Sequence, residues 1–171
     1  VPVDRCCVPT VPTVPTVPGG SGSSGGGGTV TGSALFIEGF EAGTAGWTGT
    51  SGMTLQSGGA HTGSWAAQAL ASGGAGAYAL KPLSSAQANV YVRTWFNVKS
   101  QSTVMNLLRL RSGTGANVVT VFLSSAGDLM VRNDVGKQVV WSPTRVARNT
   151  WHQVQLRAGV SGPSGQIEVW T

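Results

Sequence analysis

At 171 residues, 10% of them charged and 26 of them glycine, the chain has the size of one domain with some tail. This composition is typical of an extracellular β protein with glycine turns and fits a helical or cytosolic enzyme poorly. The net charge of +5 comes from 11 basic residues spread along the chain, without the basic tract of a nucleic-acid-binding protein, and no apolar run approaches the ~18 residues of a membrane span.

The first notable feature in chain order is the vicinal pair Cys6 and Cys7, the only cysteines present. Neighbouring cysteines rarely bridge to each other, because the usual Cα separation in a disulfide is larger. The pair is open to several interpretations: disulfides to upstream residues, a metal-ligand pair, lipidation, or the frayed end of a preceding module. The sandwich predicted below contains no cysteine, so its stability must come from its core.

Residues 1–28 are predicted to be a low-complexity linker. Val-Pro-Thr repeats fill residues 8–18, and a run of Gly and Ser alone fills residues 19–28. Proline at every third position prevents a helix or central strand and favours an extended polyproline-II spacer, whereas Gly and Ser form a flexible coil. This arrangement is typical of secreted proteins with several covalently linked modules. We expect residues 1–28 to pack against nothing, because few apolar side chains offset the entropy of ordering.

From about residue 30 the sequence predicts a domain made of short strands bounded by Gly and Ser clusters, with no helix of ten residues. The predicted strands cover residues 34–40, 54–56, 65–70, 77–80, 89–98, 107–111, 118–123, 129–133, 139–141, 151–156 and 167–170. Ser124–Asp128 is predicted to be a hairpin turn. Regularly spaced strands and turns favour an all-β, antiparallel two-sheet β-sandwich over an α/β fold.

The clearest strand is Asn89–Val98, which alternates strictly between two faces. One face carries valine, threonine and phenylalanine and is predicted to join a core. The expected core members are Val90, Val92, Phe96, Val121, Leu123, Val154 and Leu156. The chain stops inside its last predicted strand, so we expect the sandwich, placed at residues 30–171, to be C-terminally truncated and to leave one sheet with an open edge.

Several segments together resemble the concanavalin A-like (laminin-G-like) jelly-roll domains of secreted bacterial proteins. They are Phe36-Ile-Glu-Gly-Phe-Glu with Gly46-Trp-Thr, His61-Thr-Gly-Ser-Trp-Ala-Ala, Val90-Tyr-Val-Arg-Thr-Trp-Phe, and Thr150-Trp-His-Gln-Val-Gln-Leu followed by Ile167-Glu-Val-Trp. The resemblance covers roughly residues 35–171. It implies two curved antiparallel sheets and, in many relatives, a face that holds extended glycans.

The resemblance also implies, in some relatives, a structural calcium ion near the N-terminal strand. Glu38 and Glu41 are the candidate ligands here, because calcium prefers six to eight oxygen atoms. Two solvated carboxylates at a strand edge are the alternative interpretation. No other cofactor is expected.

Catalysis is not expected. A retaining glycosidase needs two carboxylates about 5 Å apart, and no predicted strand carries two of the six acidic residues at such spacing. The chain also lacks the Gln-x-His strand of lyases with this fold and a Gly-x-Ser-x-Gly nucleophile elbow.

The second face of the clearest strand carries Tyr91, Arg93 and Trp95, where a half-buried strand would place small polar residues. Aromatic rings stack on sugars, and Arg pairs bidentately with carboxylate or sulfate. If Arg109, Arg111 and Arg132 project from adjacent strands, they would complete a groove for a polysaccharide, including an acidic one. The alternative is that these side chains merely pack or snorkel over buried surface.

The leading hypothesis is a non-catalytic carbohydrate-binding or adhesion module of a secreted or cell-surface protein. The alternatives are a protein-binding or purely structural laminin-G-like module and a fragment of a glycan-active hydrolase or lyase.

Overall fold

Alternating side chains and glycine-rich turns give this chain an all-β structure built from antiparallel sheets. The computed structural model describes residues 4–8, 34–159 and 165–171. These residues contain no helix, and hence none long and apolar enough to cross a membrane. Of the predicted linker, residues 1–3 and 9–28 lie outside the described residues.

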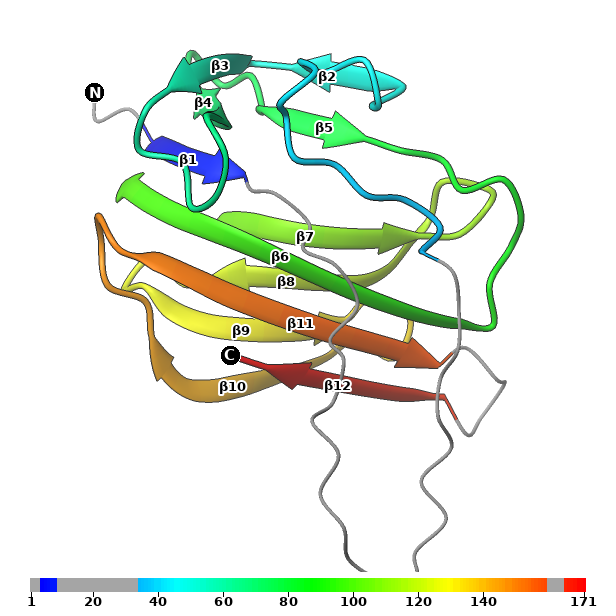
Figure 1. The fold of residues 1–171 in the computed structure, drawn as a ribbon. Coiled ribbons are helices and arrows are strands. Elements are labelled where there is room, and N and C mark those ends of the chain that lie inside the picture. Colours follow the sequence, from blue (N-terminus) through cyan, green and yellow to red (C-terminus); the bar gives the residue numbers. More distant parts are fainter. Residues whose placement is uncertain (1–3, 9–33, 160–164) are drawn as a thin grey trace, which may run out of the picture.

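Three sheets are present in the described part of the chain (Figure 1). The six-stranded sheet has the order β12 (Gln166–Trp170), β11 (Trp151–Gly159), β6 (Asn89–Ser100), β1 (Asp4–Val8), β4 (Trp65–Ala71) and β3 (Met53–Ser57). The four-stranded sheet has the order β10 (Gln138–Arg145), β9 (Asp128–Asn133), β8 (Asn117–Leu123) and β7 (Met105–Arg111). A small third sheet pairs β2 (Gly49–Ser51) with β5 (Tyr78–Leu80).

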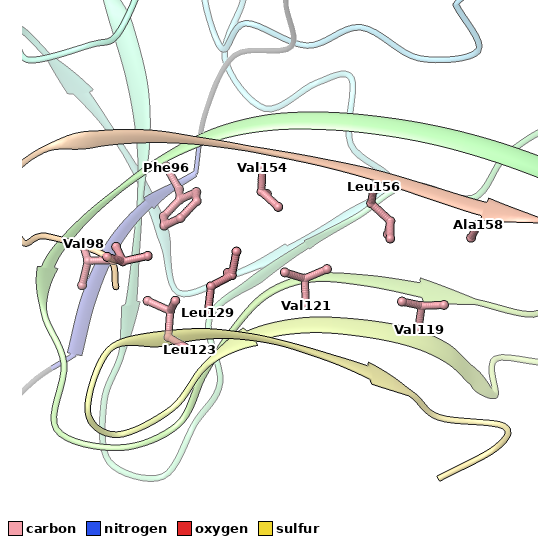
Figure 2. Packing of buried hydrophobic residues seen from close by; sticks show 10 residues of the cluster. Phe96, Val98, Val119, Val121, Leu123, Leu129, Val154, Leu156 and Ala158 are labelled. Atoms are coloured by element: carbon pink, nitrogen blue, oxygen red, sulfur yellow. The ribbon is translucent and has the colours of Figure 1, made fainter. Parts of the chain in front are cut away.

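The two larger sheets pack face to face through one hydrophobic core. Figure 2 shows side chains of β6 and β11 directed toward side chains of β8 and β9. The buried cluster consists of Phe96, Val98, Val119, Val121, Leu123, Leu129, Val146, Val154, Leu156 and Ala158. Each strand that contributes to this cluster therefore has an inner face toward the core and an outer face away from it.

Five of the seven predicted core residues belong to this cluster, which confirms the predicted faces of β6, β8 and β11. The other two, Val90 and Val92, are only partly buried and lie outside the cluster. Among the described residues, their half of β6 pairs with β11 alone, because β1 pairs with β6 only near its C-terminal end, from Asn97 to Ser100. An unpaired edge leaves the inner face of a strand more accessible.

Residues 4–8, which the sequence assigned to the linker, form β1 in the middle of the six-stranded sheet. β1 fills the gap between β6 and β4, so that Cys6 lies opposite Val98 on one side and Ala69 on the other. That part of the linker assignment is therefore wrong. The stabilising interactions are backbone hydrogen bonds to strands more than 55 residues away in sequence, which the local pattern of β1 does not reveal.

The predicted first strand, residues 34–40, is not a strand in the structure. Glu38 Oε1 accepts hydrogen bonds from the backbone amides of Gly39 and Phe40, at 3.0 and 2.8 Å. These local bonds replace the ladder bonds that a strand would make. Phe40 adopts a positive φ of 62° and is fully buried, with its ring stacked against Trp47 at 6.1 Å between centroids.

The predicted hairpin turn at Ser124–Asp128 is confirmed. The backbone amide of Gly127 donates to the carbonyl of Ser124, and the amide of Ser124 donates to the carbonyl of Asp128. Gly127 has a φ of 89°, a conformation that favours glycine at this position.

The edges of the two larger sheets, β12 and β10, border an open cleft. Its volume is about 450 Å³, and its lining includes the apolar side chains of Val131, Val140, Ile167 and Val169. Within the described residues β12 pairs only with β11 and β10 only with β9, so both strands have a free edge here.

Candidate functional site

The candidate site is the outer face of the six-stranded sheet, where β6, β11 and β12 lie side by side. β11 pairs with β6 along its whole length, and β12 pairs with the C-terminal half of β11. Because Phe96, Val154 and Leu156 point into the core, the alternate residues of these strands point outward. The sequence-predicted face of Tyr91, Arg93 and Trp95 is therefore confirmed as an outer face.

Antiparallel pairing arranges these outward side chains in cross-strand rows. The rows are Tyr91–Arg157–Glu168, Arg93–Gln155–Trp170, Trp95–Gln153 and Asn97–Trp151. We call the first two rows together with Gln153 the β6–β11–β12 face. It combines aromatic rings with amide and guanidinium groups.

Tyr91 is the accessible aromatic residue that the sequence predicted on this face. Its side chain is 56% exposed, and the guanidinium of Arg157 lies 5.6 Å from its ring centroid. Arg157 in turn donates from Nη1 to Glu168 Oε2 at 3.0 Å. This hydrogen bond, followed by the nearby Tyr91 and Glu168, raises the pKa of Arg157 above its ordinary value, so the guanidinium stays charged. The first row is thus an ordered group of three side chains.

Trp170 is a second accessible aromatic residue, 49% exposed, on the neighbouring row. It lies opposite Gln155, whose Nε2 donates to Gln153 Oε1 at 2.6 Å. Strand and residue spacings place the Cα atoms of Tyr91 and Trp170 roughly 12 Å apart. The two rings are therefore far enough apart to contact different sugar units of one chain, with the amides between them.

Trp95 is not an open ring of this face. The imidazole of His61 lies flat on it, with centroids 3.7 Å apart and an interplanar angle of 17°, and meets Trp151 edge-on at 5.7 Å. Trp151 Nε1 also donates to the carbonyl of Gly59 at 3.3 Å. The loop between β3 and β4, residues 58–64, thus covers the Trp95 end of the outer face.

The two proposed calcium ligands serve other contacts. Glu38 caps the amides of Gly39 and Phe40, and Glu41 Oε1 accepts from the backbone amides of Ser64 and Trp65, both at 3.0 Å. The described residues contain no group of three or more His, Cys, Asp or Glu side chains that could hold a metal ion. The two carboxylates hold separate loops, and their geometry gives the expected calcium site no support.

Arg109, Arg111 and Arg132 do not join the β6–β11–β12 face, contrary to the expected groove. They lie on β7 and β9 of the four-stranded sheet, which packs against the six-stranded one. Arg109 and Arg132 both align with Thr120, whose neighbours Val119 and Val121 point into the core. These two arginines therefore face away from the sandwich on the opposite side. A bulge between Leu110 and Arg111 separates Arg111 from the Arg109 position.

The structure adds Gln153, Gln155, Arg157, Glu168 and Trp170 to the site. Alternation within residues 151–156 and 167–170 indicates their face once Val154 and Leu156 are assigned to the core. What the sequence does not indicate is that β11 lies next to β6, because β6 is separated from it by four other strands in the chain.

The arrangement presents groups that can bind a ligand. It offers two accessible rings for stacking and several hydrogen-bond donors and acceptors, but its one carboxylate, Glu168, is paired with Arg157. Comparisons of this chain with protein families, with curated proteins and with solved structures found no match.

Proposed function

We propose that this chain is a non-catalytic carbohydrate-binding module that holds an extended polysaccharide across the β6–β11–β12 face. The observation that carries the proposal is the exposure of Tyr91 and Trp170 on one sheet face, 56% and 49%, around a set of ordered polar side chains. Covering an exposed tyrosine and tryptophan with a partner gains free energy, because it removes apolar surface from water.

The chemistry of the face matches that of a sugar chain. A pyranose ring has an apolar face that stacks on an aromatic ring and hydroxyl groups that need donors and acceptors. Tyr91 and Trp170 supply the rings, while Gln153 and Gln155 supply amides already linked by a 2.6 Å hydrogen bond. Pre-ordered side chains lose less entropy on binding.

The charges of the face support a neutral or weakly charged ligand. The charge of Arg157 is compensated by Glu168 at 3.0 Å, and the other cationic side chain of the two rows is Arg93. A single paired carboxylate does not supply the acid and the nucleophile of glycoside hydrolysis, which supports binding without catalysis.

We also propose that the two larger sheets correspond to a concanavalin A-like jelly roll of a secreted or cell-surface protein, with covalently linked neighbouring modules. The all-β antiparallel architecture supports this assignment. The Val-Pro-Thr and Gly/Ser sequence of residues 8–28 supports the presence of a neighbouring module.

A glycan-array screen tests the function. The parent chain and a Tyr91→Ala/Trp170→Ala double variant are applied to neutral and acidic oligosaccharides, with calcium and with a chelator. We expect the parent to bind a defined set of glycans and the double variant to lose its binding to the neutral ones. A parent chain that binds no glycan under either condition contradicts the proposal and favours the protein-binding alternative.

A further inference from the structure

The outer face of the four-stranded sheet carries a second group of side chains that the proposed face does not use. One cross-strand row consists of Arg109, Thr120, Arg132 and Val139 on β7, β8, β9 and β10. Thr120 is fully buried although its neighbours in sequence point into the core. Its backbone lies between those of Arg109 and Arg132 on the two neighbouring strands.

The central acid of this group is Asp134, and both of its oxygens are engaged. Thr120 Oγ1 donates to Oδ2 and Arg132 Nε donates to Oδ1, both at 2.6 Å. Burial alone would raise the pKa of Asp134, but these hydrogen bonds and the charges of Arg132 and Arg109 outweigh it and lower the pKa. Asp134 is therefore an anion whose bonds are directed to Thr120 and Arg132.

Arg109 is the cation of this group that does not donate a hydrogen bond to Asp134. Its Nε is buried, with no hydrogen-bond partner among the described residues. Two guanidinium groups face one carboxylate, so the row keeps a charge of about +1. A buried N–H donor without a partner is costly, and an oxyanion that binds the Arg109 guanidinium gains charge-assisted hydrogen bonds.

We propose that Arg109 is the centre of a second binding site, which takes the carboxylate or sulfate group of an acidic glycan. This inference rests on the proposed glycan-binding function and extends it to a second face of the sandwich. The site is distinct from the β6–β11–β12 face, because the two sheets present opposite sides to solvent.

Trp141 gives this site the apolar surface that a sugar requires. It aligns with the outward-facing Met130 and is 64% exposed. Three strand spacings separate β7 from β10, or about 14 Å. A ligand that reaches both Arg109 and Trp141 must therefore be an oligosaccharide rather than a single sugar or a free ion.

Calorimetric titration of the 171-residue chain at low salt tests this site with three probes: inorganic sulfate, a galacturonic acid tetrasaccharide and the same tetrasaccharide with reduced carboxyl groups. Arg109→Gln should lower the affinity for the acidic tetrasaccharide by roughly tenfold or more. Arg109→Lys, which keeps the charge but not the planar fork, should also weaken it. The exposed Arg111 provides the matched control, and Arg111→Gln should change the affinity by less than about twofold.

Two further arms separate this site from the proposed one. Trp141→Ala should lower the affinity for the acidic tetrasaccharide and leave the affinity for sulfate unchanged. The double variant Tyr91→Ala/Trp170→Ala should instead lower the affinity for the reduced, neutral tetrasaccharide. Because Arg109 also helps to lower the pKa of Asp134, Arg109→Gln should lose some stability, and its urea unfolding curve should show that it remains folded under the titration conditions. Unchanged affinity of Arg109→Gln for the acidic tetrasaccharide, or no binding of it by the parent, would overturn the Arg109 site. Unchanged affinity of Trp141→Ala for the acidic tetrasaccharide would overturn the inference that one oligosaccharide contacts both Arg109 and Trp141.

Discussion

The imidazole of His61 lies flat on the indole of Trp95, with ring centroids 3.7 Å apart. This contact fixes the loop of residues 58–64 over one end of the outer face and removes Trp95 from the accessible rings. The sequence predicts that the Trp95 ring stacks on a sugar. The loop that covers the ring comes from a part of the chain more than 30 residues earlier.

Replacing His61 by alanine should destabilise the fold by about 0.5–1.5 kcal/mol, because an aromatic pair contributes about that much beyond its buried area. Urea unfolding at neutral pH measures the change. His61→Phe is the matched control, since it keeps a flat ring against Trp95 and should lose less. Equal losses in the two variants would show that the stack does not hold the loop.

Phe96→Ala should reduce the free energy of unfolding by about 3–5 kcal/mol, because it leaves a cavity in the core between the two sheets. Phe96 is 3% exposed, whereas Tyr91, on the other face of the same strand, is 56% exposed. Tyr91→Ala should therefore cost less than about 1 kcal/mol. A reversed order of the two losses in urea unfolding would mean that the faces of β6 are exchanged.

Asp134→Asn should lower stability by about 1–3 kcal/mol at neutral pH, since it weakens the charge-assisted bonds from Arg132 and Thr120. The folded pKa of Asp134 lies below its unfolded value near 3.8. Its contribution is therefore fully present above about pH 4 and is lost as the pH falls through the lower folded value. Unfolding of the parent and the variant measured from pH 7 down to pH 2 should converge only at the acid end. A constant difference down to pH 2 would contradict the assignment.

The backbone amides of Cys6 and Cys7 should exchange slowly with solvent, because β1 lies between two paired strands. Hydrogen exchange followed by NMR measures the rates. The exposed β10 edge residue Val140 provides a comparison, and its amide should exchange faster than that of Cys6. Fast exchange at both cysteines would indicate that residues 4–8 belong to the linker and not to the sheet.

The fold class and most strands could be predicted from the sequence because alternation is a local property. Residues 89–98 and 151–156 show it directly, and the core faces of Phe96 and Val154 follow from it. Residues 34–40 misled the prediction, since their apolar character serves the packing of Phe40 against Trp47 rather than a strand.

The candidate site could be predicted only in part, because alternation does not indicate which strands are neighbours. The sequence placed Arg109 beside Tyr91, but β6 and β7 belong to different sheets and their outward side chains diverge. Arg157 and Trp170 were missed for the same reason, since they reach Tyr91 only through the pairing of β11 with β6 and β12.

The proposed binding mode places a glycan across β6, β11 and β12. NMR titration of the isotope-labelled chain with the glycan retained most strongly on the array tests it most directly. We expect chemical-shift changes concentrated at Tyr91, Gln155, Arg157 and Trp170, with little change at the core residues Val121 and Leu129. Shifts confined to other surfaces of the sandwich, with the Tyr91 and Trp170 signals unmoved, would contradict it.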